Sequence, residues 1–215
     1  MKYIMGIFMV SIVMINVSFA HQPRLVFQAP TGEIIHIENP EISQAFYGIL
    51  SGQEDNYQIV SDTGFLLYVS LVVPDISWSM TDFTIDINQG DSPLIPRLDG
   101  KYFSRSWFFE KFAWDTYLQW PTREKLVAPG IYTIKISNPE KKGKYSLAIG
   151  KKESFPFNEI IHTYKVLPEL KIVFFEKPWY TIFLNYVWWF FIAILLVIVV
   201  IIWWIIHRIQ HKKQR

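Results

Sequence analysis

The feature that most constrains this chain is an uninterrupted apolar run near its C-terminus, VWWFFIAILLVIVVIIWWII, from Val187 to Ile206. At a rise of 1.5 Å per residue, a helix of about 20 such residues matches the roughly 30 Å hydrocarbon core of a bilayer. A buried core helix is the alternative, but a domain of this size seldom buries a helix that is apolar on every face. We therefore predict a transmembrane helix over residues 181–206.

Aromatic and basic residues flank this run. Tryptophan pairs lie near both ends of a membrane span, and basic residues follow it on the cytoplasmic side. We expect residues 207–215 to form a basic cytoplasmic tail close to anionic lipid head groups. The side chains predicted to lie at the membrane interface are Trp188, Trp189, Trp203, Trp204, Arg208, Lys212, Lys213 and Arg215.

The N-terminal residues 1–20, MKYIMGIFMVSIVMINVSFA, have the layout of a secretory signal peptide. Lys2 gives a positive start, an apolar run follows, and Ser18 and Ala20 are the small residues that precede a cleavage site. An uncleaved N-terminal anchor is the alternative. Both ends of the chain predict a single-pass protein of the cell membrane, with its N-terminus outside and its C-terminus in the cytoplasm.

The segment between the two ends is acidic and lacks cysteine. All 19 acidic residues lie between Arg24 and Lys177, together with 16 of the 21 basic ones. A nucleic-acid surface needs a clustered basic face, so we expect no nucleic-acid partner. Without disulfides, the exported domain must be held together by burial, and its size is ordinary for one domain.

Residues 21–152 are predicted to form an extracytoplasmic all-β domain. Short segments rich in β-branched and aromatic residues are separated by Gly, Pro, Asn and Asp turns. Many short strands without long helical intervals favour an antiparallel β-sandwich or jelly roll. Residues 100–130 show no clean period, and we interpret them as a long connection that covers one end of the sandwich. The predicted strands are residues 33–38, 56–61, 65–73, 83–87, 131–137 and 144–150.

Residues 153–180 are predicted to form a juxtamembrane helical stalk. Asn158 suits the N-cap of a first short helix, and Pro168 suits the first position of a second one. Both helices carry apolar residues beside the predicted span. They either lie in the membrane interface or pack under the sandwich.

The segment APGIYTIKISNPEKKGKYSLAIG carries a familiar arrangement: Pro129-Gly130 leads into a strand with Tyr132, and a hairpin returns through Gly143, Tyr145 and Leu147. It resembles the last two strands of pre-peptidase C-terminal domains, which are jelly-roll modules of secreted bacterial and archaeal proteins. The resemblance covers most of residues 38–150. It implies a fold and a location but no reaction, since such modules are accessories to another activity. Some members bind calcium, but no calcium-ligand motif can be matched here.

The stretch IVSDTGF presents Asp62 in the Asp-Thr-Gly pattern of aspartic peptidases. Those enzymes need two carboxylates that share one site, so this chain could act only as a homodimer. The alternative is an ordinary turn between two strands, since Asp and Gly favour turns. We predict that Ser61 to Gly64 form that turn, with Asp62 exposed and without a carboxylate partner.

Other chemistry is sparse. The sequence contains no Gly-x-Ser-x-Gly, His-Glu-x-x-His or Ser-x-x-Lys motif, and we expect no cofactor and no metal. The aromatic residues Trp107, Trp114 and Trp120 either form a platform for stacking sugars or fill the core. The leading hypothesis is a membrane-anchored binding or accessory module without catalytic activity, whose partner, besides the lipid bilayer, is another envelope protein or a polysaccharide. A homodimeric aspartic peptidase and a carbohydrate-binding ectodomain are the alternatives.

Overall fold

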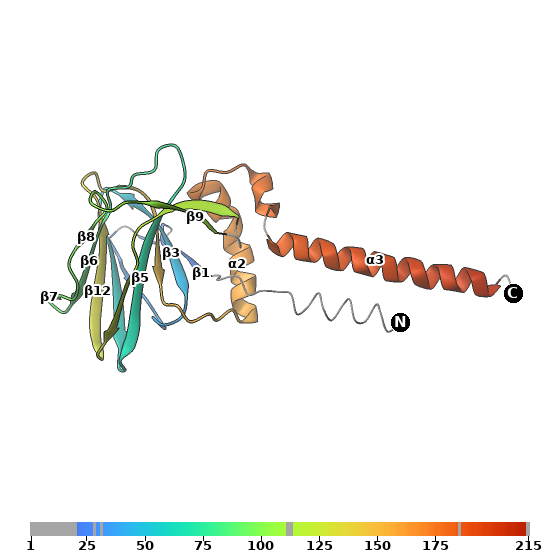
Figure 1. The fold of residues 1–215 in the computed structure, drawn as a ribbon, viewed down its shortest axis with the longest axis horizontal. Helices are drawn as coiled ribbons and strands as arrows, with labels where there is room; N and C mark the ends of the chain where they lie inside the picture. Colours follow the sequence, from blue (N-terminus) through green and yellow to red (C-terminus); the bar gives the residue numbers. More distant parts are fainter. Residues whose placement is uncertain (1–20, 28, 31, 111–113, 185, 214–215) are drawn as a thin grey trace.

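The computed structural model describes residues 21–27, 29–30, 32–110, 114–184 and 186–213. The predicted signal peptide and Arg215 lie outside these residues. Figure 1 shows a two-layered β-sandwich, a shorter helix beside it and a long helix that projects away from it.

The described residues contain two β-sheets. The seven-stranded sheet has the order β1 (Gln22–Leu25), β3 (Gln44–Ser51), β13 (Lys142–Ile149), β5 (Phe65–Pro74), β10 (Asp115–Gln119) and β9 (Ser106–Glu110), and β11 (Arg123–Val127) also pairs with β5. The six-stranded sheet has the order β2 (Ile34–His36), β4 (Asp55–Ser61), β12 (Gly130–Ser137), β6 (Thr84–Gln89) and β7 (Ser92–Pro93), and β8 (Leu98–Asp99) also pairs with β6.

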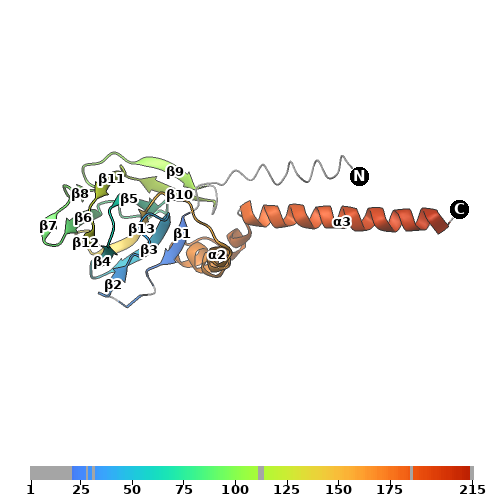
Figure 2. The same ribbon diagram turned by 90° about the horizontal axis from the view of Figure 1, so that it is seen from below.

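The predicted β-sandwich is therefore confirmed. Most neighbouring strands are antiparallel, as predicted, but the pairs β1–β3 and β2–β4 are parallel. Both parallel pairs lie at a sheet edge, where the N-terminal part of the chain adds one strand to each sheet (Figure 2).

The main core lies between the two sheets and follows the alternation of side chains along each strand. On β12, Tyr132, Ile134 and Ile136 are fully buried, whereas Ile131 is exposed. A buried polar chain crosses this core. The hydroxyls of Tyr57 and Tyr145 lie 2.7 Å apart, and Tyr145 donates a hydrogen bond to Asp55 Oδ2 at 2.5 Å.

Residues 100–130 are not a connection, and this expectation was wrong. They contain strands β9, β10 and β11, of which β9 and β10 form an antiparallel pair. Their period is unclear because β9 is an edge strand whose residues 106–109 are all exposed. An edge strand with two accessible faces does not need apolar and polar residues to alternate.

The stalk is one continuous helix where two were predicted. The α-helix α2 (Phe157–Glu169) contains Pro168 and continues directly into the π-helix η1 (Leu170–Phe174). Pro156, and not Asn158, occupies the N-cap position. The helix persists through Pro168 because its apolar side is held by the outer face of the seven-stranded sheet. The buried cluster there comprises Ala45, Tyr47, Val72, Tyr117, Leu170, Phe174 and Phe175.

The C-terminal helix α3 (Tyr186–Lys213) is long and apolar enough to cross a membrane. Its most apolar window, Ile192–Gln210, has a mean hydropathy of 2.7 and is not buried against the rest of the protein. The helix begins later than residue 181, because residues Trp179–Phe183 form a separate 3₁₀-helix, η2. The backbone of Leu184 then leaves the helical region, with φ −93° and ψ 67°.

Candidate functional site

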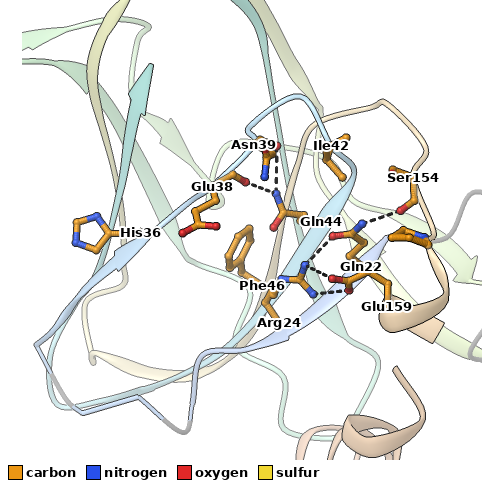
Figure 3. A pocket seen from close by; sticks show the side chains of 11 residues that line it. Gln22, Arg24, His36, Glu38, Asn39, Ile42, Gln44, Phe46, Ser154 and Glu159 are labelled. Carbon is orange, nitrogen blue, oxygen red and sulfur yellow. Dashed lines mark hydrogen bonds and ion pairs between the residues drawn. The ribbon is translucent and has the colours of Figure 1, made fainter. Parts of the chain in front are cut away.

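A polar pocket of about 520 Å³ opens between β1, the segment from β2 to β3 and the start of α2 (Figure 3). Its walls come from parts of the chain that are far apart in sequence. Eight polar residues line it: Gln22, Arg24, His36, Glu38, Asn39, Gln44, Ser154 and Glu159.

Arg24 and Glu159 form the base of one wall. The guanidinium donates from Nη1 to Glu159 Oε2 at 2.9 Å and from Nη2 to Oε1 at 3.1 Å. It also donates to Gln22 Oε1 at 2.6 Å, and Gln22 Nε2 donates to the carbonyl of Ser154 at 2.7 Å. A two-pronged ion pair fixes geometry as well as charge. Because Glu159 lies in the first turn of α2, this pair ties the helix to strand β1.

Gln44 shapes the opposite wall. Its Nε2 donates to the carbonyl oxygens of Glu38 at 2.8 Å and Asn39 at 3.3 Å. Asn39 has a φ of 51°, in the left-handed region that Asn tolerates better than most residues. The loop held in this way leaves His36 and Glu38 exposed at the rim, with His36 well apart from Arg24 in Figure 3.

The pocket offers amide, guanidinium, imidazole and carboxylate groups for hydrogen bonding. Its deeper polar groups, Arg24, Gln22 and Gln44, already have partners, while the rim groups His36 and Glu38 face solvent. In the described parts of the chain, no three His, Asp or Glu side chains gather in a way that could hold a metal ion. The arrangement is suited to exchanging hydrogen bonds with a polar ligand.

A second polar group joins the stalk to the sandwich. Asp115 on β10 accepts hydrogen bonds from Lys171 Nζ and Lys177 Nζ, each at 2.6 Å. Burial lowers the pKa of Lys171, while the carboxylate of Asp115 acts in the opposite direction. We call Asp115, Lys144, Lys171, Glu176 and Lys177 the stalk junction.

Lys144 and Glu176 complete the stalk junction. Lys144 on β13 donates to the carbonyl of Val173 at 2.6 Å and to Glu176 Oε1 at 2.8 Å. Glu176 Oε2 accepts a hydrogen bond from Trp78 Nε1 at 2.9 Å. The hydrogen bond from Lys144 lowers the pKa of Glu176. The junction therefore fixes residues 170–177 on two strands of the same sheet.

The three candidate tryptophans are not brought together into one platform. Trp120 is 3% exposed and packs near Phe83 in the main core, with ring centroids 6.3 Å apart. For Trp120 the core alternative is confirmed and its place among the candidate sugar-binding residues is wrong, because a buried ring cannot receive a ligand. Trp107 on β9 and Trp114 in the turn before β10 are exposed.

Asp62 lies in an exposed bend between β4 and β5. Ser61 Oγ donates to the carbonyl of Thr63 at 2.8 Å within the same bend. The predicted turn over Ser61 to Gly64 is confirmed. Asp62 does not line the polar pocket described above.

The predicted membrane-interface residues lie on α3 as far as the structure describes them. Trp203 and Trp204 are exposed, and the Arg208 guanidinium lies 4.4 Å from the ring centre of Trp204. Trp188 lies near the first turn of the helix, 5.0 Å from the ring of Phe183. Trp189, Lys212 and Lys213 belong to the same helix.

Sequence reasoning missed both polar groups. Arg24 and Glu159 are 135 positions apart, so no local pattern connects them. For the stalk junction a signal existed: Lys171 is the single charge within LKIVFF. A charge inside an apolar helical face requires a buried partner, which is Asp115.

Comparisons with known proteins give no family. No protein-family model and no curated protein matches the sequence. Among solved structures, the pre-peptidase C-terminal domain of a collagenase from Bacillus anthracis is similar over 57% of this chain and 97% of that domain, with 11% identity and a TM-score of 0.34. A β-glucosidase from Paenibacillus barengoltzii is similar over 60% of this chain but 13% of that enzyme, with 12% identity and a TM-score of 0.25.

A pre-peptidase C-terminal domain is thus among the solved structures to which this chain is similar. The assignment as a β-sandwich rests on the strand pairing of this chain.

Proposed function

We propose that this protein is a membrane-anchored binding module without catalytic activity, in which α3 crosses the cell membrane and displays the sandwich on its outer side. The polar pocket at the start of α2 is its binding site. The partner is another envelope protein or a polysaccharide, since both present the polar groups that such a pocket can bind.

The stalk junction is the observation that carries this proposal. A flexible tether would leave the sandwich free to turn, but Asp115 and Lys144 hold the residues that lead into η2 and α3. The pocket uses the same helix, because Glu159 lies in the first turn of α2. The continuous helix formed by α2 and η1 therefore runs from the pocket to the stalk junction, and η2 lies between that junction and α3. This arrangement favours display of the pocket at a fixed position relative to the membrane.

Cysteine accessibility tests the topology, since the natural chain contains no cysteine. Val60 is exposed on β4, and Gln210 lies near the end of α3. In intact cells we expect a membrane-impermeant maleimide to label Val60→Cys but not Gln210→Cys until the membrane is permeabilised. The reverse pattern would contradict the proposed orientation.

Site-specific photo-crosslinking tests the pocket. A photoreactive amino acid at His36 on the rim should give a discrete crosslinked protein, or a polysaccharide adduct, in intact cells. The matched control is the same substitution at Ile131, which is exposed on β12 of the same six-stranded sheet. The same adducts at both positions would count against a specific site.

The two alternatives have less support. The exposed bend that holds Asp62 is a poor setting for a peptidase carboxylate, which needs a partner carboxylate in a shared cleft. For the sugar-stacking alternative, Trp120 is buried in the core, and the exposed residues Trp107 and Trp114 remain as candidates. Peptide hydrolysis that disappears in Asp62→Asn would revive the first alternative and refute the proposed lack of activity.

A further inference from the structure

The β9–β10 hairpin carries large aromatic side chains that the sandwich does not cover. Trp107, Phe109 and Trp114 are 68%, 43% and 44% exposed. The rings of Phe109 and Trp114 meet edge to face, with centroids 5.4 Å apart. Clustered exposed aromatics cost solubility, so their presence points to a surface that is covered in use.

The hairpin lies close to the place where the chain enters α3. Lys177 Nζ donates to the carbonyl of Trp114 at 3.3 Å, and Lys177 precedes the first residue of α3 by nine positions. Between them, η2 exposes Trp179, Tyr180 and Phe183 by 67%, 53% and 46%. Aromatic side chains from two separate elements thus gather beside the start of the apolar helix.

Helix α2 also carries exposed apolar side chains. In both views it lies between the sandwich and the start of α3, and in Figure 1 it runs across the direction of α3. Leu167 and Leu170 are buried on the side toward the sheet. Phe157 and Ile161, one helical turn apart, are 76% and 42% exposed. This is the layout of a helix that lies flat on a membrane surface.

We infer that the β9–β10 hairpin and α2 rest on the outer surface of the same bilayer that α3 crosses, so that the ectodomain is held against the membrane. Trp, Tyr and Phe rings favour the head-group region, where their apolar bodies leave water. The inference rests on the proposed membrane anchor. A bilayer is favoured over a protein partner because the aromatic surface is continuous with the segment that leads into the span.

Depth-dependent fluorescence quenching tests this inference on the full chain. Four variants each carry a single cysteine in place of Phe109, Phe157, Tyr180 or Val60. Each cysteine is labelled with a nitrobenzoxadiazole dye, and the protein is then reconstituted into vesicles of phosphatidylcholine and phosphatidylglycerol. We expect a nitroxide on the upper acyl chain to quench the dye at Phe109 and Phe157 several-fold more than at Val60, and as strongly as at Tyr180. If Phe109→Cys fails to fold, Trp107→Cys takes its place.

The outcomes separate the inference from the proposed anchor. If the dye at Tyr180 is quenched but the dyes at Phe109 and Phe157 are quenched no more than the dye at Val60, the inference is overturned. The proposed membrane anchor is then unaffected. Absence of quenching at Tyr180 would overturn both. A blue-shifted emission at Phe109 without lipid quenching would indicate cover by protein, a second copy included, and would also overturn the inference.

Discussion

The carboxylate of Asp115 and the ammonium group of Lys171 lie 2.6 Å apart, and their side chains are 0% and 1% exposed. Removing two charges from water costs several kcal/mol for each ion, and their attraction repays this only while both partners are present. Lys177 binds the second carboxylate oxygen at 2.6 Å. The contacts of both Lys171 and Lys177 with the sandwich therefore depend on one buried acid.

Replacing that acid should loosen the stalk. We expect Asp115→Ala to lower the free energy of unfolding by about 3–5 kcal/mol, because it removes the carboxylate with which the buried charge of Lys171 is paired. Denaturant unfolding of the full chain in detergent, followed by tryptophan fluorescence, measures the change. Asp62→Ala, at an exposed bend, is the matched control and should change stability by less than about 0.5 kcal/mol.

A rescue variant separates lost charge balance from lost packing. Asp115→Leu combined with Lys171→Met replaces the pair by apolar groups and should recover most of the stability lost in Asp115→Ala. Equal stability of the Asp115→Ala and Asp62→Ala variants would show that the buried pair contributes nothing.

Alkaline pH should destabilise the sandwich. Burial raises the pKa of Tyr57, Tyr117 and Tyr145 well above the ordinary value. Their stabilising contribution is complete below about pH 10, where the unfolded chain begins to lose phenol protons, and it is lost as the pH rises toward their folded pKa values. Each such tyrosine should lower the free energy of unfolding by about 1.4 kcal/mol per pH unit in that window.

Unfolding curves between pH 9 and 12, with tyrosinate absorbance recorded in parallel, check this dependence. Tyr145→Phe removes one of the titrating groups and should make the slope shallower. Burial lowers the pKa of Lys171, so this residue makes the free energy of unfolding rise with pH. That contribution ends at about pH 10.4, the ordinary pKa of lysine. Full ionisation of all phenols near pH 10 in a folded protein would refute the prediction.

Substitutions at Trp107 and Trp120 should change stability by different amounts. Trp120→Ala opens a cavity in the main core and should cost about 3–5 kcal/mol. Trp107→Ala removes a ring that is 68% exposed and should leave stability in detergent nearly unchanged. Trp120→Phe should cost less than Trp120→Ala, since the buried Nε1 of Trp120 has no hydrogen-bond partner in the described structure. Thermal melting of the three variants distinguishes these cases.

The ion pair at the base of the pocket should couple β1 to α2. A double-mutant cycle with Arg24→Ala and Glu159→Ala should give a coupling of about 1 kcal/mol, since the two side chains are 28% and 15% exposed and form a fork. Lys151 and Glu124, which are 54% and 41% exposed, form the matched control pair. Their coupling should be close to zero, and a coupling as large as that of Arg24 and Glu159 would contradict this argument.

The sandwich could be predicted from sequence because most of its strands obey a simple rule. On β12 each inward side chain is apolar, and the pattern is visible without a structure. β9 escaped prediction because an edge strand need not alternate. The prediction that a second helix starts at Pro168 was wrong. A proline is typical of a helix start, but here the apolar contacts of Leu170 and Phe174 hold one helix together on both sides of Pro168.

The candidate site was less predictable than the fold. The pocket depends on a parallel pairing of β1 with β3 and on the docking of α2, neither of which has a local signature. Asp115 could have been predicted as a buried acid only as the partner of Lys171, which lies 56 positions later in the sequence. The residue type did not show that Trp120 is buried and Trp107 exposed, since a tryptophan side chain suits both a core and an interface.

The path of the chain from β13 to α3 also determines how the protein bears load. Under the proposed topology, tension on α3 would reach the sandwich through the stalk junction, whose Lys144 lies on β13 between β3 and β5. β13 pairs with β3 along its whole length and with β5 over Ser146–Ile149, so a load that reaches it is shared among many backbone hydrogen bonds. The proposed anchor is thus attached to a central strand of the seven-stranded sheet and, through Asp115, to β10.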